Sequence, residues 1–318
     1  MTAVQSVCGP VEPDALGHCQ IHEHIFLRAT PAAKRNPALR FDQFDRSLAE
    51  LRRYRDAGGT SIADAQPVAA GRDGAVLERL SRESGVAIIA STGYHLLDFY
   101  PQDCWIHRLG EDALCALYLD ELETGLLPWE ADSSGRPETV LPIRAGLVKA
   151  AIPAEGPVGR YEVLLRAAAR AAAQAGAPLM LHTEQGLRTE EALELCFAAG
   201  VRREKLVVCH ADRQVSDWGV HDAIAAAGVY LDYDTVARWK YHSDEEEISL
   251  LRHAWEKGYA GQVLLALDTT ARRLSAYGGE IGLDHLLTRF LPALCQAGFP
   301  EDVVSGFNRA NCQRLFGN

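Results

Sequence analysis

The stretch Gln20-Ile21-His22-Glu23-His24-Ile25-Phe26 places two histidines one residue apart within an apolar run. In a β-strand, residues two positions apart project from the same face. His22 and His24 are therefore expected to point to one side of a strand, where two imidazoles can bind one metal ion. Such a pair also arises by chance, so its interpretation depends on the rest of the chain.

Short apolar segments typical of buried strands recur along the chain, and most are followed by a segment that predicts a helix. Beyond the His22 segment, the predicted strands are 60–65, 86–92, 145–152, 178–184, 206–212, 229–234 and 262–268. The predicted helices are 41–57, 73–84, 112–125, 161–175, 190–199, 217–227, 244–257, 282–297 and 300–316. This alternation favours a parallel sheet, and eight units favour a closed (β/α)8 TIM barrel. A doubly wound open sheet is the alternative, but no Gly-x-Gly-x-x-Gly motif follows the first strand.

Length and composition fit one large domain. The 318 residues exceed the usual size of a domain, but barrels of this kind reach it, and no linker or internal repeat divides residues 1–318. Residues 28–40 and 128–137 are predicted to be loops. The formal net charge of −11 argues against a general surface for nucleic acid or anionic membranes, and leaves room for a local basic pocket. Eight cysteines without a Cys-x-x-Cys motif, and no leader-like start, predict reduced thiols and a cytoplasmic location.

Polar residues with metal-binding chemistry stand at the ends of several predicted strands. In a (β/α)8 barrel the active site is built at the carboxyl ends of the strands, so these side chains are expected to converge. Taken singly, each histidine could be a satisfied core residue, and the last aspartate could cap the next helix. The lysine lies inside a buried strand, where it must reach water or lose its charge. In strand order the residues are His22 and His24, Lys149, His182, His210 and Asp268.

This ordered pattern resembles the phosphotriesterase-like family of the amidohydrolase superfamily, and among its members most closely the sugar lactonases. The resemblance covers nearly the whole chain. Further matches are Asp64 with Gly71-Arg72-Asp73, Thr92-Gly93-Tyr94, and Asn311 with Arg314-Leu315-Phe316. Cys312 departs from the pattern, because many relatives have proline there.

The resemblance implies a centre of two divalent metal ions. His22, His24 and Asp268 would hold the more buried ion, and His182 and His210 the more exposed one. Lys149, carboxylated by carbon dioxide, would bridge both. Nitrogen and oxygen ligands suit Zn²⁺, with Mn²⁺, Co²⁺ or Fe²⁺ as alternatives. Paired ions lower the pKa of a shared water, and Asp268 could take its proton and pass it to the leaving group.

The resemblance also suggests residues that contact the substrate. Tyr94 resembles a tyrosine that lactonase members place beside the exposed metal, although it could equally pack on the barrel rim. Loops seven and eight of such barrels often form an anion site. Cationic and hydroxyl side chains there are candidates for holding a phosphate, unless they are solvated or pair with the acidic run 244–247. The candidates are Lys240, Arg273 and Tyr277, with Arg272 and Arg238 in addition.

We therefore expect a metal-dependent hydrolase that opens a small anionic, phosphorylated sugar lactone. A phosphotriesterase and a carboxylesterase or amidase are alternatives that would use the same centre. A barrel that only binds a ligand is a further alternative, and absence of metal would favour it. The resemblance allows a homodimer, although no segment identifies an interface, and no nucleic-acid or membrane partner is expected.

Overall fold

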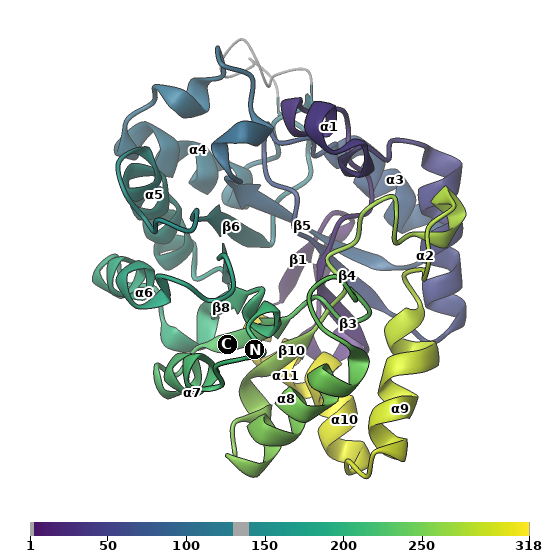
Figure 1. Cartoon of the computed structure of the whole chain (residues 1–318). Coiled ribbons are helices and arrows are strands. Elements are labelled where there is room, and N and C mark those ends of the chain that lie inside the picture. The colour runs from purple at the N-terminus through teal and green to yellow at the C-terminus, as the bar shows by residue number, and fades with distance from the viewer. Residues whose placement is uncertain (1–2, 130–139, 318) are drawn as a thin grey trace.

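Eight parallel strands form a nearly closed barrel in the computed structural model, which describes residues 3–129 and 140–317 (Figure 1). Each strand pairs with its neighbour in the chain, in the order β3 to β10. The predicted (β/α)8 barrel is confirmed, and the doubly wound alternative is wrong, because the strand order never reverses. The strands are β3 (Cys19–Glu23), β4 (Ser61–Asp64), β5 (Ala87–Gly93), β6 (Leu147–Ala151), β7 (Leu179–His182), β8 (Leu206–Cys209), β9 (Tyr230–Tyr233) and β10 (Val263–Leu265).

Side chains help to join the last strand to the first. The side-chain amide of Asn308 donates to the carbonyl oxygens of Cys19 and Leu265, at 3.0 and 2.7 Å. Glu23 Oε1 accepts from the backbone N–H of Leu267 at 2.8 Å. These buried contacts satisfy backbone groups at the seam between β3 and β10 that would otherwise lack partners.

Helices surround the barrel on its outer side (Figure 1). They are α1 (Pro31–Arg35), α2 (Phe44–Asp56), α3 (Gly74–Ser84), α4 (Glu111–Glu123), α5 (Arg160–Ala175), α6 (Thr189–Ala198), α7 (Gly219–Ala226), α8 (Asp244–Glu256), α9 (Leu291–Gln296), α10 (Glu301–Asn308) and α11 (Ala310–Gly317). Asp73 caps α3 by accepting from Val76 N at 3.1 Å. Among these helices, none in the described part of the chain has the length and apolar character needed to cross a bilayer.

Three predictions of local structure need correction or cannot be judged. Residues 28–40 are not only loop, because they contain α1 and a 3₁₀ turn at Pro37–Leu39. The predicted helix 282–297 is a π-helical turn, Leu286–Phe290, followed by α9. Pro292 lies in the first turn of α9, where the missing N–H of proline is tolerated. The predicted loop 128–137 lies outside the described residues from position 130 onward.

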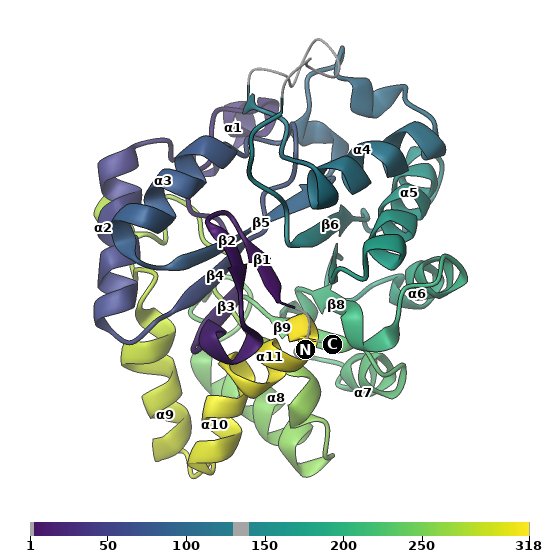
Figure 2. The same ribbon diagram turned by 180° about the vertical axis from the view of Figure 1, so that it is seen from behind.

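The apolar core has two parts. One part fills the barrel interior below the site, and the other lies between the strands and the helices. A hairpin that the sequence did not predict, β1 (Val4–Ser6) with β2 (Gly9–Val11), lies across the amino-terminal end of the barrel (Figure 2). Val7 N donates to Ile88 O at 2.8 Å near the start of β5. The opposite end, where the strands finish, is left open for a site.

A β-bulge in β3 contributes to the direction of the His-x-His pair. Between Gln20 and Glu23 the chain advances three residues while its partner β4 advances two, from Ile62 to Asp64. An extra residue shifts the alternation of side chains by one position. Ile21 therefore packs in the barrel interior, and His22, its direct neighbour, also reaches the barrel axis.

Candidate active site

A cavity of about 560 Å³ opens at the carboxyl ends of the strands. Five of the six predicted metal ligands line this cavity, and the sixth, Lys149, contacts one of them from below. None of these five side chains is more than 13% exposed, so polar groups line the base of the cavity. The five are His22, His24, His182, His210 and Asp268.

The first group of ligands comes from β3, β6 and the segment after β10. Nitrogen and oxygen atoms of His22, His24 and Asp268 lie within 4.8 Å of one another, close enough for one ion. Lys149 Nζ lies 3.0 Å from His22 Nε2 and 3.8 Å from Cys209 Sγ. A fully buried lysine beside ligand atoms is poorly placed as a bare cation.

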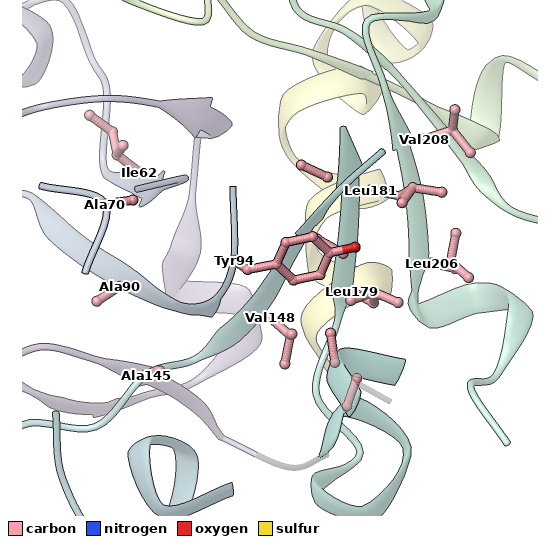
Figure 3. Close-up of a cluster of buried hydrophobic side chains, with 14 of the residues drawn as sticks. Ile62, Ala70, Ala90, Tyr94, Ala145, Val148, Leu179, Leu181, Leu206 and Val208 are labelled. Atoms are coloured by element: carbon pink, nitrogen blue, oxygen red, sulfur yellow. The ribbon is translucent and has the colours of Figure 1, made fainter. Parts of the chain in front are cut away.

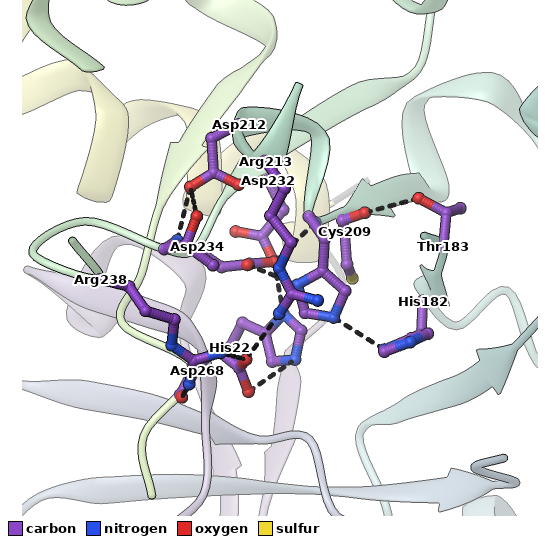
Figure 4. Close-up of polar contacts among 12 residues, drawn as sticks. His22, His182, Thr183, Cys209, Asp212, Arg213, Asp232, Asp234, Arg238 and Asp268 are labelled. Atoms are coloured by element: carbon purple, nitrogen blue, oxygen red, sulfur yellow. Dashed lines mark hydrogen bonds and ion pairs between the residues drawn. The ribbon is translucent and has the colours of Figure 1, made fainter. Parts of the chain in front are cut away.

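The second group comes from β7 and β8. His182 Nδ1 and His210 Nε2 face each other at 2.7 Å (Figure 4). The His182 ring also approaches the ring of His95, with centroids 5.2 Å apart. His210 has a left-handed backbone, with φ of 64°, a conformation that residues other than glycine rarely adopt and that occurs often at functional sites.

Burial sets the protonation of these histidines. It lowers the pKa of His22 to about 4, and the nearby lysine charge adds to this effect. Burial also lowers the pKa of His182 and His210 below the ordinary value. The imidazoles are therefore neutral near pH 7, as metal ligands must be. His24 Nδ1 is buried without a hydrogen-bond partner among the described residues. This donor set fits two divalent ions.

Two aspartates at the end of β9 orient the histidines. Asp234 contacts Nδ1 of both His22 and His210, at 3.0 and 2.5 Å, and Asp232 contacts His22 Nδ1 at 2.8 Å (Figure 4). The Nε2 atoms are thereby left facing the centre, an arrangement that fixes ring direction in metal sites. The sequence analysis missed both aspartates. The period-two pattern Asp232-Tyr233-Asp234 at a strand end was the available signal.

Asp268 is held by two arginines. Its Oδ2 accepts from Arg238 at 2.6 Å and from Arg213 at 3.0 Å, while Oδ1 lies 3.4 Å from His24 Nε2. Burial raises the pKa of Asp268, but Arg238 and the histidines outweigh it and hold the pKa well below its ordinary value. These contacts do not fit the alternative in which Asp268 caps a helix. Arg213 is a further site residue that the sequence analysis missed.

Four of the five predicted anion-binding residues line the cavity, and the guanidinium of one of them is already bound to the backbone of a loop. Arg238, Lys240 and Arg272 line the cavity, and so does Arg273. The Arg273 guanidinium, however, donates to the carbonyl oxygens of residues 236 and 237, at 2.6 and 3.0 Å. Its side chain therefore supports the loop after β9, whereas Lys240 packs over Tyr241 with Nζ 4.3 Å from the ring centroid.

Tyr277 does not line the cavity, and its predicted role as a phosphate ligand is wrong. Its hydroxyl contacts Ser47 Oγ at 2.8 Å and accepts from Gln43 N at 3.2 Å. The ring stacks edge-on against Phe41 at 5.8 Å between centroids. Tyr277 thus attaches the segment after β10 to α2.

Tyr94 is also absent from the cavity wall, so its predicted position beside a metal is wrong. The side chain is fully buried among apolar residues that include Val148 and Leu179 (Figure 3). Its hydroxyl has no hydrogen-bond partner in the described part of the chain. The next residue, His95, enters the cavity instead.

A model of the phosphotriesterase family matches residues 2–316. The chain belongs to the phosphotriesterase family. The family's binuclear centre agrees with the converging histidines, lysine and aspartate, and the protein is a metal-dependent hydrolase.

The chain is similar to proteins whose names denote different activities. The solved structure of the phosphotriesterase homology protein from Escherichia coli, complexed with phosphate in its active site, superimposes with a TM-score of 0.85. It is 27% identical and covers 95% of this chain and 99% of that one. A phospho-furanose lactonase from Mycoplasmopsis synoviae is 26% identical over 94% of this chain and 87% of its own length. An N-acetyltaurine hydrolase from Danio rerio is 26% identical, over 95% and 94%.

Proposed function

We propose that this protein is a lactonase that opens a small, phosphorylated sugar lactone. The observation that carries the proposal is one cavity with two chemically different walls. Its base holds the histidine–aspartate centre, and the loops after β9 and β10 place the cations of Arg238, Lys240 and Arg272 around it. A volume of about 560 Å³ suits a small ligand whose anionic end lies away from the reacting ring.

The residues fit a binuclear centre in the following way. His22, His24 and Asp268 would hold one ion, and His182 and His210 the other. Carboxylation of Lys149 would convert its buried cation into an anion with two oxygen donors, which both ions can share. When bound, two divalent ions supply a Lewis acid for the substrate carbonyl and a water of lowered pKa. Zn²⁺ suits these donors best, and Mn²⁺, Co²⁺ or Fe²⁺ could replace it.

Asp268 is the proposed proton carrier. Arg213 and Arg238 occupy its Oδ2, so Oδ1 is the oxygen that faces the centre. From there it can take a proton from the attacking water and deliver it to the ring oxygen that leaves. The low pKa of this carboxylate means that it accepts a proton only transiently, which suits transfer to an alkoxide leaving group.

Lys240 and Arg272 are the proposed phosphate ligands. Neither donates a hydrogen bond or forms an ion pair in the contacts of the described residues, so both are available to an anion, and charge-assisted bonds to phosphate are strong. Arg238 is shared between the two walls, because it lines the cavity and already contacts Asp268. The phospho-furanose lactonase relative supports this assignment of substrate class.

Other hydrolases are the alternatives. The N-acetyltaurine hydrolase relative favours an amidase that acts on an anionic compound, because that name specifies hydrolysis of an N-acetyl amide. A phosphotriesterase is less well supported by the cavity, since neutral triesters gain little from the cations of its loops.

A panel of substrates separates these reactions. Metal-loaded protein would be mixed with phosphorylated aldonolactones, N-acetyl amides of anionic amines, aryl esters and aryl phosphotriesters, and turnover followed with a pH indicator or by product analysis. We expect the lactones to have the highest kcat/KM by about 10²-fold or more, which corresponds to about 2.8 kcal/mol of transition-state discrimination. Amide turnover that exceeds lactone turnover would overturn the assignment.

A further inference from the structure

A second cluster of buried titratable side chains lies beside the cavity but does not line it. Asp212 follows β8, His242 ends the loop after β9, and Glu247 lies in the first turn of α8. One ligand atom from each of the three lies within 4.8 Å of the others. His242 Nε2 is 3.2 Å from Glu247 Oε2 and 3.7 Å from Asp212 Oδ2. Asp212 and Glu247 have no exposed surface, and His242 is 4% exposed.

Three of the four carboxylate oxygens of this cluster have no hydrogen-bond donor among the described residues. Neither oxygen of Glu247 has a hydrogen-bond partner among the described residues, and the same holds for Asp212 Oδ1. The other oxygen of Asp212 accepts from the amide and the hydroxyl of Thr235, at 2.5 and 2.6 Å. Buried carboxylates without donors are costly, so a positive species between them would be strongly stabilised. Arg273, whose charge interacts with Asp212, already donates to two carbonyl oxygens of the adjacent loop.

The tautomer of His242 fits a metal ligand. Its Nδ1 lies 3.1 Å from the carbonyl oxygen of Ser243, which can only accept, so Nδ1 carries a hydrogen. In the neutral ring, Nε2 then presents its lone pair to the two carboxylates. Thr235 Oγ1 lies 3.0 Å from the same Nε2 and gives its own hydrogen to Asp212, so without an ion this contact is a hydrogen bond only when Nε2 also carries a hydrogen. A metal-bound histidine typically donates its other ring N–H to a backbone carbonyl in this way.

We propose that Asp212, His242 and Glu247 bind a third divalent cation, of Zn²⁺ type, with a structural role. Ligands about 2.1 Å from one tetrahedral ion stand about 3.4 Å apart, which lies between the separations of 3.2 and 3.7 Å around His242 Nε2. One imidazole and two carboxylates carry two negative charges, which one divalent ion balances. Protons are the competing occupants, because a protonated His242 and a protonated Glu247 would also neutralise the cluster.

The position of the cluster defines what the ion would stabilise. Thr235 and His242 flank the loop whose residues 237–241 line the cavity, and Glu247 attaches that loop to α8. An ion at this position would cross-link β8, the loop after β9 and α8. The loop would then be ordered by metal binding independently of the binuclear centre. This inference does not depend on the substrate proposed above.

Anomalous diffraction tests the proposal on the unaltered chain. Protein expressed and crystallised with Zn²⁺ would be measured on both sides of the zinc absorption edge. We expect an anomalous peak between Asp212, His242 and Glu247 that is separate from any peak at His22 or His210. Absence of a peak within this cluster overturns the proposal whether or not the binuclear centre is occupied, and would assign the cluster to protons.

Metal counting on variants provides a second test. Glu247→Gln should bind one Zn²⁺ fewer per chain than the unaltered protein, and should lose the ion that a chelator removes most slowly. Glu245→Gln is the matched control, because Glu245 lies in the same turn of α8 but is exposed. Equal zinc content in all three proteins would contradict the proposal. If Glu247→Gln does not fold, the diffraction measurement still decides.

Discussion

The binuclear centre and the Asp212–His242–Glu247 cluster use the same residue types but differ in access. The centre lies at the base of a cavity of about 560 Å³, and several of its nitrogen atoms face that space. The cluster is enclosed between β8, α8 and the loop after β9, with no member on the cavity wall. Catalytic metal sites keep a position open for water or substrate, whereas structural sites are closed. Access to a substrate, rather than ligand chemistry, therefore assigns the two regions different roles.

Removing the bridging lysine should abolish metal binding at the binuclear centre and leave the Asp212–His242–Glu247 cluster unaffected. Lys149→Ala removes the group that both ions are proposed to share, so kcat/KM should fall by about 10³-fold or more, together with loss of two ions. Bicarbonate or a short carboxylic acid should partly restore both. Turnover and zinc content of the same preparation provide the measurement, and full activity in the variant would eliminate the bridging role.

Weakening the hydrogen bonds that orient the histidines should lower zinc affinity and kcat/KM by a smaller factor. Asp234→Asn weakens the contacts that direct both His22 and His210, and loss of such partners typically lowers metal affinity or activity about 10- to 100-fold. Zinc affinity and kcat/KM would be compared with Asp222→Asn. Asp222 contacts the ring of His253 at 2.7 Å, outside the cavity, so its substitution should leave both quantities unchanged.

Removing a cation from the loops that line the cavity should change KM more than kcat. Lys240→Ala should raise KM for a phosphorylated lactone about 10-fold, or about 1.4 kcal/mol, because one charge-assisted contact is lost. The unphosphorylated analogue should change little. Lys257→Ala is the control, since that lysine is exposed and does not line the cavity. An equal rise in KM for both substrates would remove Lys240 from the phosphate site.

The smallest effect is expected at Tyr94. Tyr94→Phe deletes a buried hydroxyl that has no partner in the described residues, so kcat/KM should stay within about twofold. Tyr100→Phe is a useful comparison, because Tyr100 Oη accepts from the backbone N–H of His95, which lines the cavity. That substitution should lower stability by about 1 kcal/mol. A large loss of activity in Tyr94→Phe would restore the role implied by the resemblance.

The convergence of the candidate metal ligands could be predicted because regular strand geometry positions them. His182 pairs in register with Ala151 on one side and with Cys209 on the other, so residues at successive strand ends are brought together by the sheet itself. His22 and His24 both line the cavity, but the β3 bulge that accompanies His22 was not predicted. A bulge inserts one residue by local geometry that apolar alternation does not encode.

The loop residues were less predictable. Side chains in irregular segments have no fixed period, so Tyr94 was assigned to the cavity although its neighbour His95 occupies that position. Tyr277 and Arg273 were chosen for their chemistry, and both instead make contacts that hold loops in place. The pairing of Arg213 with Asp268 joins residues 55 positions apart in sequence, and no local pattern marks it.

The central claim is that one cavity combines hydrolysis with recognition of a phosphate. The most direct test compares kcat/KM for a phosphorylated γ-lactone and for the same lactone without its phosphate, using protein shown to carry metal. We predict a ratio of about 10²-fold or more in favour of the phosphorylated compound, which is about 2.8 kcal/mol of binding energy from the loops after β9 and β10. Equal kcat/KM values for the two compounds would contradict the account, leaving a hydrolase whose cationic wall serves another purpose.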